Sequence, residues 1–197
     1  MIIVKVGGSL YNTPELHHWL LALEEFSAQQ SIVLVPGGGP FADQVRTAQE
    51  LHHFDDDTAH HMAILAMKQF GLLLSALAPS CQTINTHDIP STPFSIWLPD
   101  DKLLSESSLL KSWDISSDSI ALWLASKLKA KQLFLIKYTS SHATSINELA
   151  SKSIVDNGFA QLFANSNIDT KIINYQAYDN LSDYISNSNG QLSLHLP

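Results

Sequence analysis

The chain has 197 residues, which suits one domain with a sizeable core, and we expect residues 1–197 to form a single domain. Its 11 lysine and arginine residues against 19 aspartate and glutamate residues give a net charge of −8, which argues against binding a nucleic-acid backbone. A single cysteine, Cys81, excludes an internal disulfide and fits a reducing compartment. No apolar run reaches the length of a membrane span, so we expect a cytoplasmic protein with no membrane partner.

The first predicted strand, residues 1–6, ends in a glycine turn. Isoleucine and valine dominate it, as in a buried parallel strand, and Lys5 is its one charged residue. Gly7, Gly8 and Ser9 follow, and backbone N–H groups at such a turn can approach an anion closely. A lysine in a buried strand needs a partner or a phosphate, so this stretch is a candidate phosphate site. The alternative is a lysine at a strand edge beside an ordinary turn.

A second strand and glycine turn come after an amphipathic helix predicted at residues 14–29. Residues 31–35 (SIVLV) predict a buried strand, and Gly37, Gly38 and Gly39 separate it from the next helix. One glycine is enough for a tight turn, so three indicate bare backbone against which something packs. Ligands of parallel α/β folds bind at the carboxyl ends of the strands, which favours a ligand site here. A close crossing of two chain segments is the alternative.

Four histidines and three aspartates lie within residues 52–61. This composition allows a metal site, because histidine and carboxylate ligands suit several transition metals. We favour a different interpretation, since the histidines have no defined ligand spacing and the aspartates can cap the long apolar helix expected at residues 58–77. We therefore predict no metal site.

The second half of the chain continues with strands and helices. The expected elements are short strands in CQTIN and FSIWLP, a helix over SIALWLASKLKAK capped by Ser116 or Ser117, strands at residues 132–136 and 170–174, and a short helix within residues 175–186. The tail from residue 187 is polar, and we expect it to be frayed.

Two charged residues stand at element ends in this half. Asp118 falls in the first turn of the helix in SIALWLASKLKAK, where a carboxylate meets the positive end of the helix dipole, and this alone would explain it. Lys137 ends a strand, as Lys5 nearly does, and such lysines are expected where phosphates gather. A solvated strand end would show the same residue.

Three motifs, KVGGSL, VPGGGPFAD and WDISSDSIALWLA, resemble the amino-acid kinase family. Together with HMAILAM, the third motif most resembles the subgroup of aminomethylfuran phosphate kinases of methanofuran-type cofactor biosynthesis. The resemblance implies a three-layer α/β/α sandwich around a mostly parallel sheet. It also implies transfer of the γ-phosphoryl group of ATP, with Mg²⁺, to a phosphate or carboxylate acceptor. Homodimers are common in the family, so we expect a homodimer.

The same resemblance assigns roles to residues of this chain. The catalytic residues would be Lys5, which neutralises the γ-phosphoryl group, and Asp118, which holds the active-site lysines in place. The ATP phosphates would lie on Gly7, Gly8, Ser9 and Lys137. The phosphoryl acceptor would lie on Gly37, Gly38, Gly39, His60 and Asp114.

The chain departs from the family pattern in two places. Relatives follow the strand of Lys137 with an acidic, glycine-containing turn and a nucleotide-covering segment, whereas this chain has YTSSHATS. Many relatives carry a second phosphate-binding lysine where this chain has Phe159, Ala160 and Gln161. The leading hypothesis is an ATP-dependent small-molecule kinase, with a furan-methyl phosphate as the acceptor that the subgroup suggests. The alternative is a non-catalytic binding or regulatory subunit that keeps the fold but has a reduced nucleotide site.

Overall fold

The computed structural model describes residues 1–106, 109–139, 145–186 and 192–195. In these residues seven strands form one sheet in the order β3-β4-β2-β1-β5-β6-β7, and every neighbouring pair is parallel. The strands are β1 (Ile2–Val6), β2 (Ile32–Pro36), β3 (Gln82–Ile84), β4 (Phe94–Trp97), β5 (Gln132–Lys137), β6 (Asp169–Asn174) and β7 (Leu192–His195). The predicted parallel sheet is confirmed.

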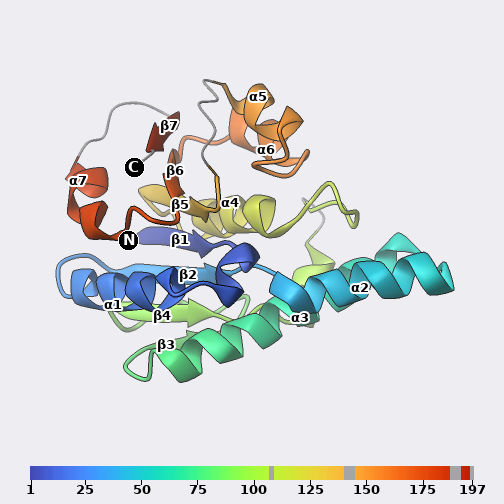
Figure 1. Ribbon diagram of the computed structural model, residues 1–197, viewed down its shortest axis with the longest axis horizontal. Coiled ribbons are helices and arrows are strands. Elements are labelled where there is room, and N and C mark those ends of the chain that lie inside the picture. Colours follow the sequence, from blue (N-terminus) through green and yellow to red (C-terminus); the bar gives the residue numbers. More distant parts are fainter. Residues whose placement is uncertain (107–108, 140–144, 187–191, 196–197) are drawn as a thin grey trace.

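Helices cover both faces of this sheet and give the predicted three layers (Figure 1). The α-helices are α1 (Glu15–Ser27), α2 (Gly39–His52), α3 (Asp56–Leu77), α4 (Ser117–Lys127), α5 (Ile146–Ser151), α6 (Phe159–Ala164) and α7 (Leu181–Ser186). Three 3₁₀ helices, η1 (Gly8–Asn12), η2 (Asp101–Ser105) and η3 (Tyr178–Asn180), lie in the connections. Among the described residues, no helix is both long enough and apolar enough to span a bilayer.

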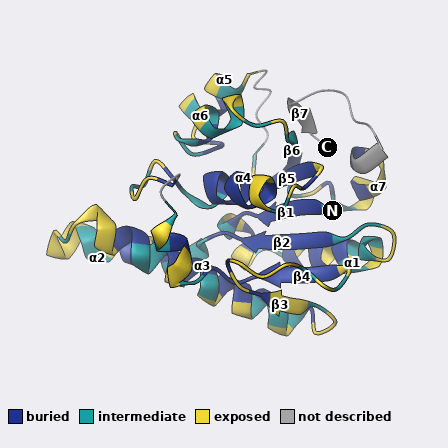
Figure 2. Cartoon of the chain, turned by 180° about the vertical axis from the view of Figure 1, so that it is seen from behind, coloured by how far each residue is buried: buried dark blue, intermediate teal, exposed yellow. Residues whose placement is uncertain are grey.

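The side chains of β1 alternate between two hydrophobic cores. Ile2, Val4 and Val6 pack in the core that α1 and part of α3 cover, whereas Ile3 packs in the core beneath α4 and α6. The central strands are buried throughout, as Figure 2 shows in dark blue. Because Lys5 has the parity of Ile3, the lysine points to the face that α4 covers.

The C-terminal tail differs from the expectation. Residues 192–195 form β7, which pairs in parallel with residues 170–173 of β6, so the prediction of a frayed tail is wrong for this part. Without β7, the outer edge of β6 would present a row of unpaired N–H and C=O groups, and the added strand satisfies them. Residues 187–191, also included in that expectation, lie outside the described residues.

The two glycine turns cross at very short range. A Cβ atom on Gly8 would lie 2.3 Å from the nitrogen of Gly39, and a Cβ atom on Gly37 would lie 2.7 Å from the nitrogen of Gly8. Gly39 has a φ of +56°, a conformation that side chains rarely adopt. The close crossing that the sequence left as an alternative therefore exists, and it requires these glycines whether or not a ligand binds.

Gly8→Ala is expected to destabilise the protein, because its Cβ atom would meet the Gly39 backbone and not a movable side chain. Overpacking of this kind costs about 1–3 kcal/mol of unfolding free energy, which urea unfolding followed by tryptophan fluorescence measures. Ser9→Ala, at the exposed neighbouring position, is the control and should stay within about 0.5 kcal/mol of the wild type. Equal stability of the two variants would contradict the tight crossing.

Candidate active site

A buried carboxylate held between two lysines forms the centre of the site. Lys5 extends from β1, Lys137 ends β5, and Asp118 lies in the first turn of α4. The Nζ atom of Lys5 is 2.8 Å from Oδ1 of Asp118, and the Nζ atom of Lys137 contacts Oδ2. The side chains of Lys5 and Asp118 are only 5% and 3% exposed. The structure thus brings together three residues that the sequence singled out separately.

The register of the sheet explains why both lysines reach one carboxylate. Lys5 pairs with Leu135 across the β1–β5 ladder, so Lys137 lies two residues further along the neighbouring strand and on the same face. Helix α4 covers that face, and its first turn carries Asp118 to the carboxyl ends of both strands. The charges therefore meet where parallel α/β folds bind ligands.

The electrostatics of this cluster favour an anionic ligand. Burial alone would raise the pKa of Asp118, but the ammonium groups of Lys137 and Lys5 outweigh burial and lower that pKa to about 2. Burial lowers the pKa of Lys137 to about 8, while Asp118 acts in the opposite direction. Two lysines therefore share the single carboxylate of Asp118, and Asp156 acts on Lys137 more weakly, so the surroundings of the cluster favour an anion.

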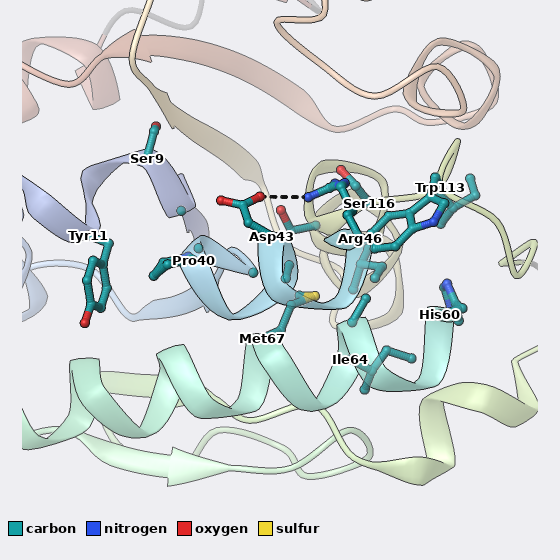
Figure 3. Close-up of a pocket in the computed structure, with 18 of the residues that line it drawn as sticks. Ser9, Tyr11, Pro40, Asp43, Arg46, His60, Ile64, Met67, Trp113 and Ser116 are labelled. Carbon is teal, nitrogen blue, oxygen red and sulfur yellow. Dashed lines mark hydrogen bonds and ion pairs between the residues drawn. The ribbon is translucent and has the colours of Figure 1, made fainter. Parts of the chain in front are cut away.

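A cavity of about 410 Å³ opens between the glycine turns, α2, α3 and the loop that precedes α4 (Figure 3). Its lining includes Gly8, Ser9, Tyr11, Gly38, Gly39, Asp43, Arg46, His60, Ile64, Met67, Trp113 and Ser116. The lining combines apolar side chains from α3 with the charged Asp43 and Arg46 from α2, and it does not include Lys5, Asp118 or Lys137. This volume suits a small molecule.

The predicted glycine contacts divide into two groups. Gly8, Ser9, Gly38 and Gly39 line the cavity, as expected for residues that touch a ligand. Gly7 and Gly37 do not line it, because their N–H groups donate within the sheet. Gly7 donates to the carbonyl oxygen of Ile136 at 3.1 Å, and Gly37 donates to that of Val6 at 2.9 Å. The amides of these two glycines are therefore not available to a phosphate in this conformation.

The histidines of residues 52–61 face different surroundings. His60 is buried against the cavity, and burial, together with the positive charge of Lys111, lowers its pKa. His61 points instead to Asp101, with 3.1 Å between Nε2 and Oδ1. His52 and His53 are exposed at the end of α2. Within the described ranges, no three histidine, cysteine, aspartate or glutamate side chains are placed to hold one metal ion.

Asp55 has the capping role that the sequence suggested, whereas Asp56 and Asp57 lie in the first turn of α3. The carboxylate of Asp55 accepts a hydrogen bond from the backbone nitrogen of Thr58 at 2.8 Å, which satisfies one of the free N–H groups of the first turn. Asp57 pairs with Lys111 at 3.4 Å across the surface. The helix cap and the ion pair therefore account for Asp55 and Asp57 without a ligand or a metal ion.

Asp114 does not lie at the cavity, so the predicted substrate contact has no support in the structure. Its Oδ1 atom accepts a hydrogen bond from Asn157 at 2.9 Å, and its carbonyl oxygen accepts one from Gly158 at 2.8 Å. The preceding residue, Trp113, forms the cavity wall instead. Along an irregular loop, adjacent side chains can point in different directions, so the residue before Asp114 reaches the cavity while Asp114 does not.

Arg46 is a cavity residue that the sequence analysis missed. Its guanidinium group lies 4.2 Å from the centre of the Trp113 ring and 3.1 Å from Oδ1 of Asp43 (Figure 3). Trp113 is in turn fixed by donating from Nε1 to Gln49 at 2.7 Å. The chain contains no other arginine, and this rarity, on the helix that follows a glycine turn, was the available signal.

Asp118→Asn should show the pH dependence of the central cluster. The carboxyl group has a lower pKa in the folded protein than in the unfolded chain, so its stabilisation is present above about pH 4 and is lost as the pH falls toward about 2. At pH 7 the variant should be less stable by about 3–5 kcal/mol, because it leaves buried charge unpaired, and this gap should narrow below about pH 4. Urea unfolding of the variant and the wild type at a series of pH values measures this difference in unfolding free energy.

The control is Asp43→Asn, which removes a carboxylate that is 71% exposed. Its stability should stay within about 0.5 kcal/mol of the wild type throughout the pH range. A gap for Asp118→Asn that keeps one size from neutral to acidic pH would contradict the proposed charge state of the cluster.

Comparison with known proteins places this geometry in a family. The sequence model of the amino acid kinase family matches residues 1–108, more than half of the chain. A curated relative, [5-(aminomethyl)furan-3-yl]methyl phosphate kinase of Methanocaldococcus jannaschii, is 30% identical over 141 residues. The match covers 68% of this chain and 64% of the relative, so the chain spans less than two thirds of that protein.

Solved structures of low sequence identity share the fold. A uridylate kinase from Archaeoglobus fulgidus has a TM-score of 0.62 at 16% identity, with 86% of this chain and 88% of that chain covered. A UMP kinase from Ureaplasma parvum has a TM-score of 0.66 at 13% identity, with 94% and 93% covered. An isopentenyl phosphate kinase has a TM-score of 0.60 at 13% identity, with 99% of both chains covered. The chain belongs to the amino acid kinase family.

Proposed function

We propose that this protein is a phosphotransferase that moves the γ-phosphoryl group of ATP to a small phosphate-bearing acceptor. The observation that carries the proposal is the buried cluster of Lys5, Asp118 and Lys137 at the carboxyl ends of β1 and β5. A structural ion pair needs one lysine for one carboxylate, whereas here two lysines share Asp118, and Asp156 acts on Lys137 more weakly than Asp118 does, which favours an added anion. The kinase activity of the matched relative supports the same reaction class.

Phosphoryl transfer requires positioning and charge neutralisation more than covalent chemistry from the protein. In this proposal Lys5 and Lys137 contact the phosphoryl oxygens, and Asp118 holds both ammonium groups in place. The crossing of Gly8 and Gly39 leaves bare backbone where the two phosphate-bearing substrates meet. An ionised phosphate is already a nucleophile, so no general base is needed.

Mg²⁺ fits this site as a companion of ATP. Near the cavity the described residues offer scattered carboxylates and no cluster of ligands, which suits an ion held by phosphate oxygens and water. When bound, the ion neutralises part of the phosphate charge. The chain's own contribution is the pair of lysines and the backbone of the glycine turns.

The second phosphate-binding lysine of many relatives has no counterpart at Phe159, Ala160 and Gln161. Phe159 is fully buried in the core, so this segment has a packing role. Lys137 supplies the second positive charge at Asp118 from a different element. The missing lysine is therefore weak support for a non-catalytic subunit.

The nucleotide base would lie beyond Lys137, where Tyr138 and Tyr175 stack with ring centres 4.3 Å apart. The two residues follow β5 and β6, and the backbone nitrogen of Tyr175 donates to the carbonyl oxygen of Lys137 at 2.9 Å. Tyr138 is 62% exposed, so one face of an aromatic ring is available for a purine. Of the unusual segment YTSSHATS, residues 140–144 lie outside the described chain.

The acceptor proposal rests on the cavity and on the matched relative. Trp113, Ile64 and Met67 provide an apolar wall for a flat ring, while Arg46 and His60 provide polar contacts for a phosphate. The relative's name indicates an aminomethylfuran phosphate as its substrate. We propose a furan-methyl phosphate as the acceptor, to be compared with UMP and isopentenyl phosphate in a transfer assay.

Calorimetric titration with ATP and Mg²⁺ tests the donor half of the proposal. The wild type should bind, and Lys5→Ala and Asp118→Ala should each weaken binding by about tenfold or more, because each disrupts charged contacts to phosphate. Tyr138→Ala should weaken binding less. Lys152→Ala removes a positive charge from the surface of α5 and is the matched control, with affinity unchanged. Failure of the wild type to bind at millimolar ATP would favour the non-catalytic subunit.

Substitution of two adjacent histidines, one at a time, tests the proposed acceptor site. His60→Ala should raise the KM for the acceptor by about tenfold while the affinity for ATP changes little, because a hydrogen bond to a charged group is lost. His61→Ala is the control, since His61 points to Asp101 and does not line the cavity. Steady-state kinetics with each substrate varied separates the two effects. Equal KM values for the two variants would exclude His60 as an acceptor contact.

A further inference from the structure

The carboxylate of Asp156, in the connection between α5 and α6, accepts hydrogen bonds from several donors of two other chain segments. Its Oδ2 atom accepts hydrogen bonds from the backbone nitrogen of Ser116 at 3.0 Å, the Ser116 hydroxyl at 2.7 Å and the backbone nitrogen of Ser119 at 3.0 Å. Its Oδ1 atom accepts from the Ser119 hydroxyl and from the backbone nitrogen of Phe159 at 3.0 Å. One carboxylate thus fills its acceptor capacity with five donors.

Four of these five donors belong to the residues on either side of Asp118. Ser116 precedes α4, Ser119 lies in its first turn, and the side chain of Ser116 does not cap the helix itself. The cap expected from Ser116 or Ser117 is therefore replaced by a carboxylate from 37 to 40 residues further along the chain. The consequence is that Asp156 fixes the backbone from which Asp118 projects.

The two residues after Asp156 hold the same loop. Asn157 donates to the carboxylate of Asp114 at 2.9 Å, and Gly158 donates from its backbone to the carbonyl oxygen of Asp114 at 2.8 Å. A Cβ atom on Gly158 would lie 2.3 Å from Cδ1 of Ile115, so the segment is packed against the loop without spare room. The short run Asp156-Asn157-Gly158 docks on the start of α4.

We propose that Asp156 is a positioning residue for phosphoryl transfer, which sets the location of Asp118 and, through it, of Lys5 and Lys137. This inference rests on the phosphotransferase function proposed above. The carboxylate of Asp156 uses its acceptor capacity on Ser116, Ser119 and Phe159, so it acts through the residues it holds and not on the substrate. The competing explanation is a helix cap that contributes stability alone.

The charge of Asp156 gives a second readout beside the kinetics, because it acts directly on Lys137. Lys137 is influenced by Asp118 from α4, by Lys5 from β1 and by Asp156, whose negative charge raises the pKa of Lys137. Removal of that charge should therefore lower the pKa of Lys137. Burial and Asp118 raise the pKa of Asp156 in turn, as expected for two carboxylates close to the same lysine.

The experiment compares Asp156→Asn with Ser145→Ala. Ser145 caps α5 in the same segment by accepting from the backbone nitrogen of Glu148 at 3.3 Å, so its loss weakens a cap without touching α4. The titration of Lys137 is followed by NMR of labelled lysine side chains, with the signal assigned from Lys137→Arg. Steady-state kinetics with ATP and the furan-methyl phosphate acceptor gives kcat and KM.

For Asp156→Asn we expect the Lys137 midpoint to fall by about 0.5 pH unit or more. We also expect kcat to fall by about tenfold or more with little change in the KM for ATP, because the phosphoryl-binding charges are displaced. Ser145→Ala should change neither quantity. A kcat for Asp156→Asn equal to that for Ser145→Ala would overturn the proposal.

Two further outcomes are separable. If the wild type transfers no phosphoryl group, the proposed function fails, but the Lys137 titration still decides whether Asp156 controls the cluster. If Asp156→Asn does not fold, Ser119→Ala removes one hydroxyl donor and keeps the charge of Asp156, so the expected fall in kcat and change in the Lys137 midpoint report displacement alone. Wild-type values for both quantities in Ser119→Ala would then overturn the inference.

Discussion

The structure depends on the contact between the Asp118 carboxylate and two buried lysines. Each charge alone would be costly beneath α4, since a buried ion without a partner loses its hydration. Lys5 and Lys137 are both held to Asp118 at the carboxyl edge of the sheet. Stability alone does not explain why these charged groups are buried, because apolar residues of similar volume often stabilise a core to the same extent. A requirement for anion binding gives the cluster its physical explanation.

The sheet and most of its elements could be predicted because local patterns determine them. Short apolar runs predicted β1, β2, β5 and β6, and the apolar helix 58–77 was expected within two residues of its true start at Asp56. Lys5 and Asp118 were identified as anomalies, one a charge in a buried strand and the other an acid within a specific motif. Their contact follows from strand parity and helix placement, which the parallel α/β fold fixes.

The remaining features depend on contacts between distant segments, which no local pattern records. Asp156 caps α4 from far along the chain, and its sequence surroundings resemble any polar turn. Trp113, for which no role was predicted, lines the cavity in place of Asp114, because an irregular loop has no periodicity from which to infer the direction of a side chain. The strand β7 was missed because a polar tail gains strand structure only from the open edge of β6. The glycines at 37–39 correctly indicated the close crossing, whereas ligand approach at Gly38 and Gly39 stays a prediction.

The sheet order also governs how the molecule assembles. Strand β1 lies in the interior of the sheet between β2 and β5, although residues 7–131 separate it from β5 along the chain. Until α4 and β5 have been synthesised, β1 has one unpaired edge and Lys5 lacks its covering helix, its counter-ion and its neighbouring strand. Closure of the sheet and neutralisation of the buried charge thus both depend on residues 117–137 and are long-range events. Between the synthesis of β1 and that of β5, the nascent chain exposes an apolar strand edge that a chaperone can bind.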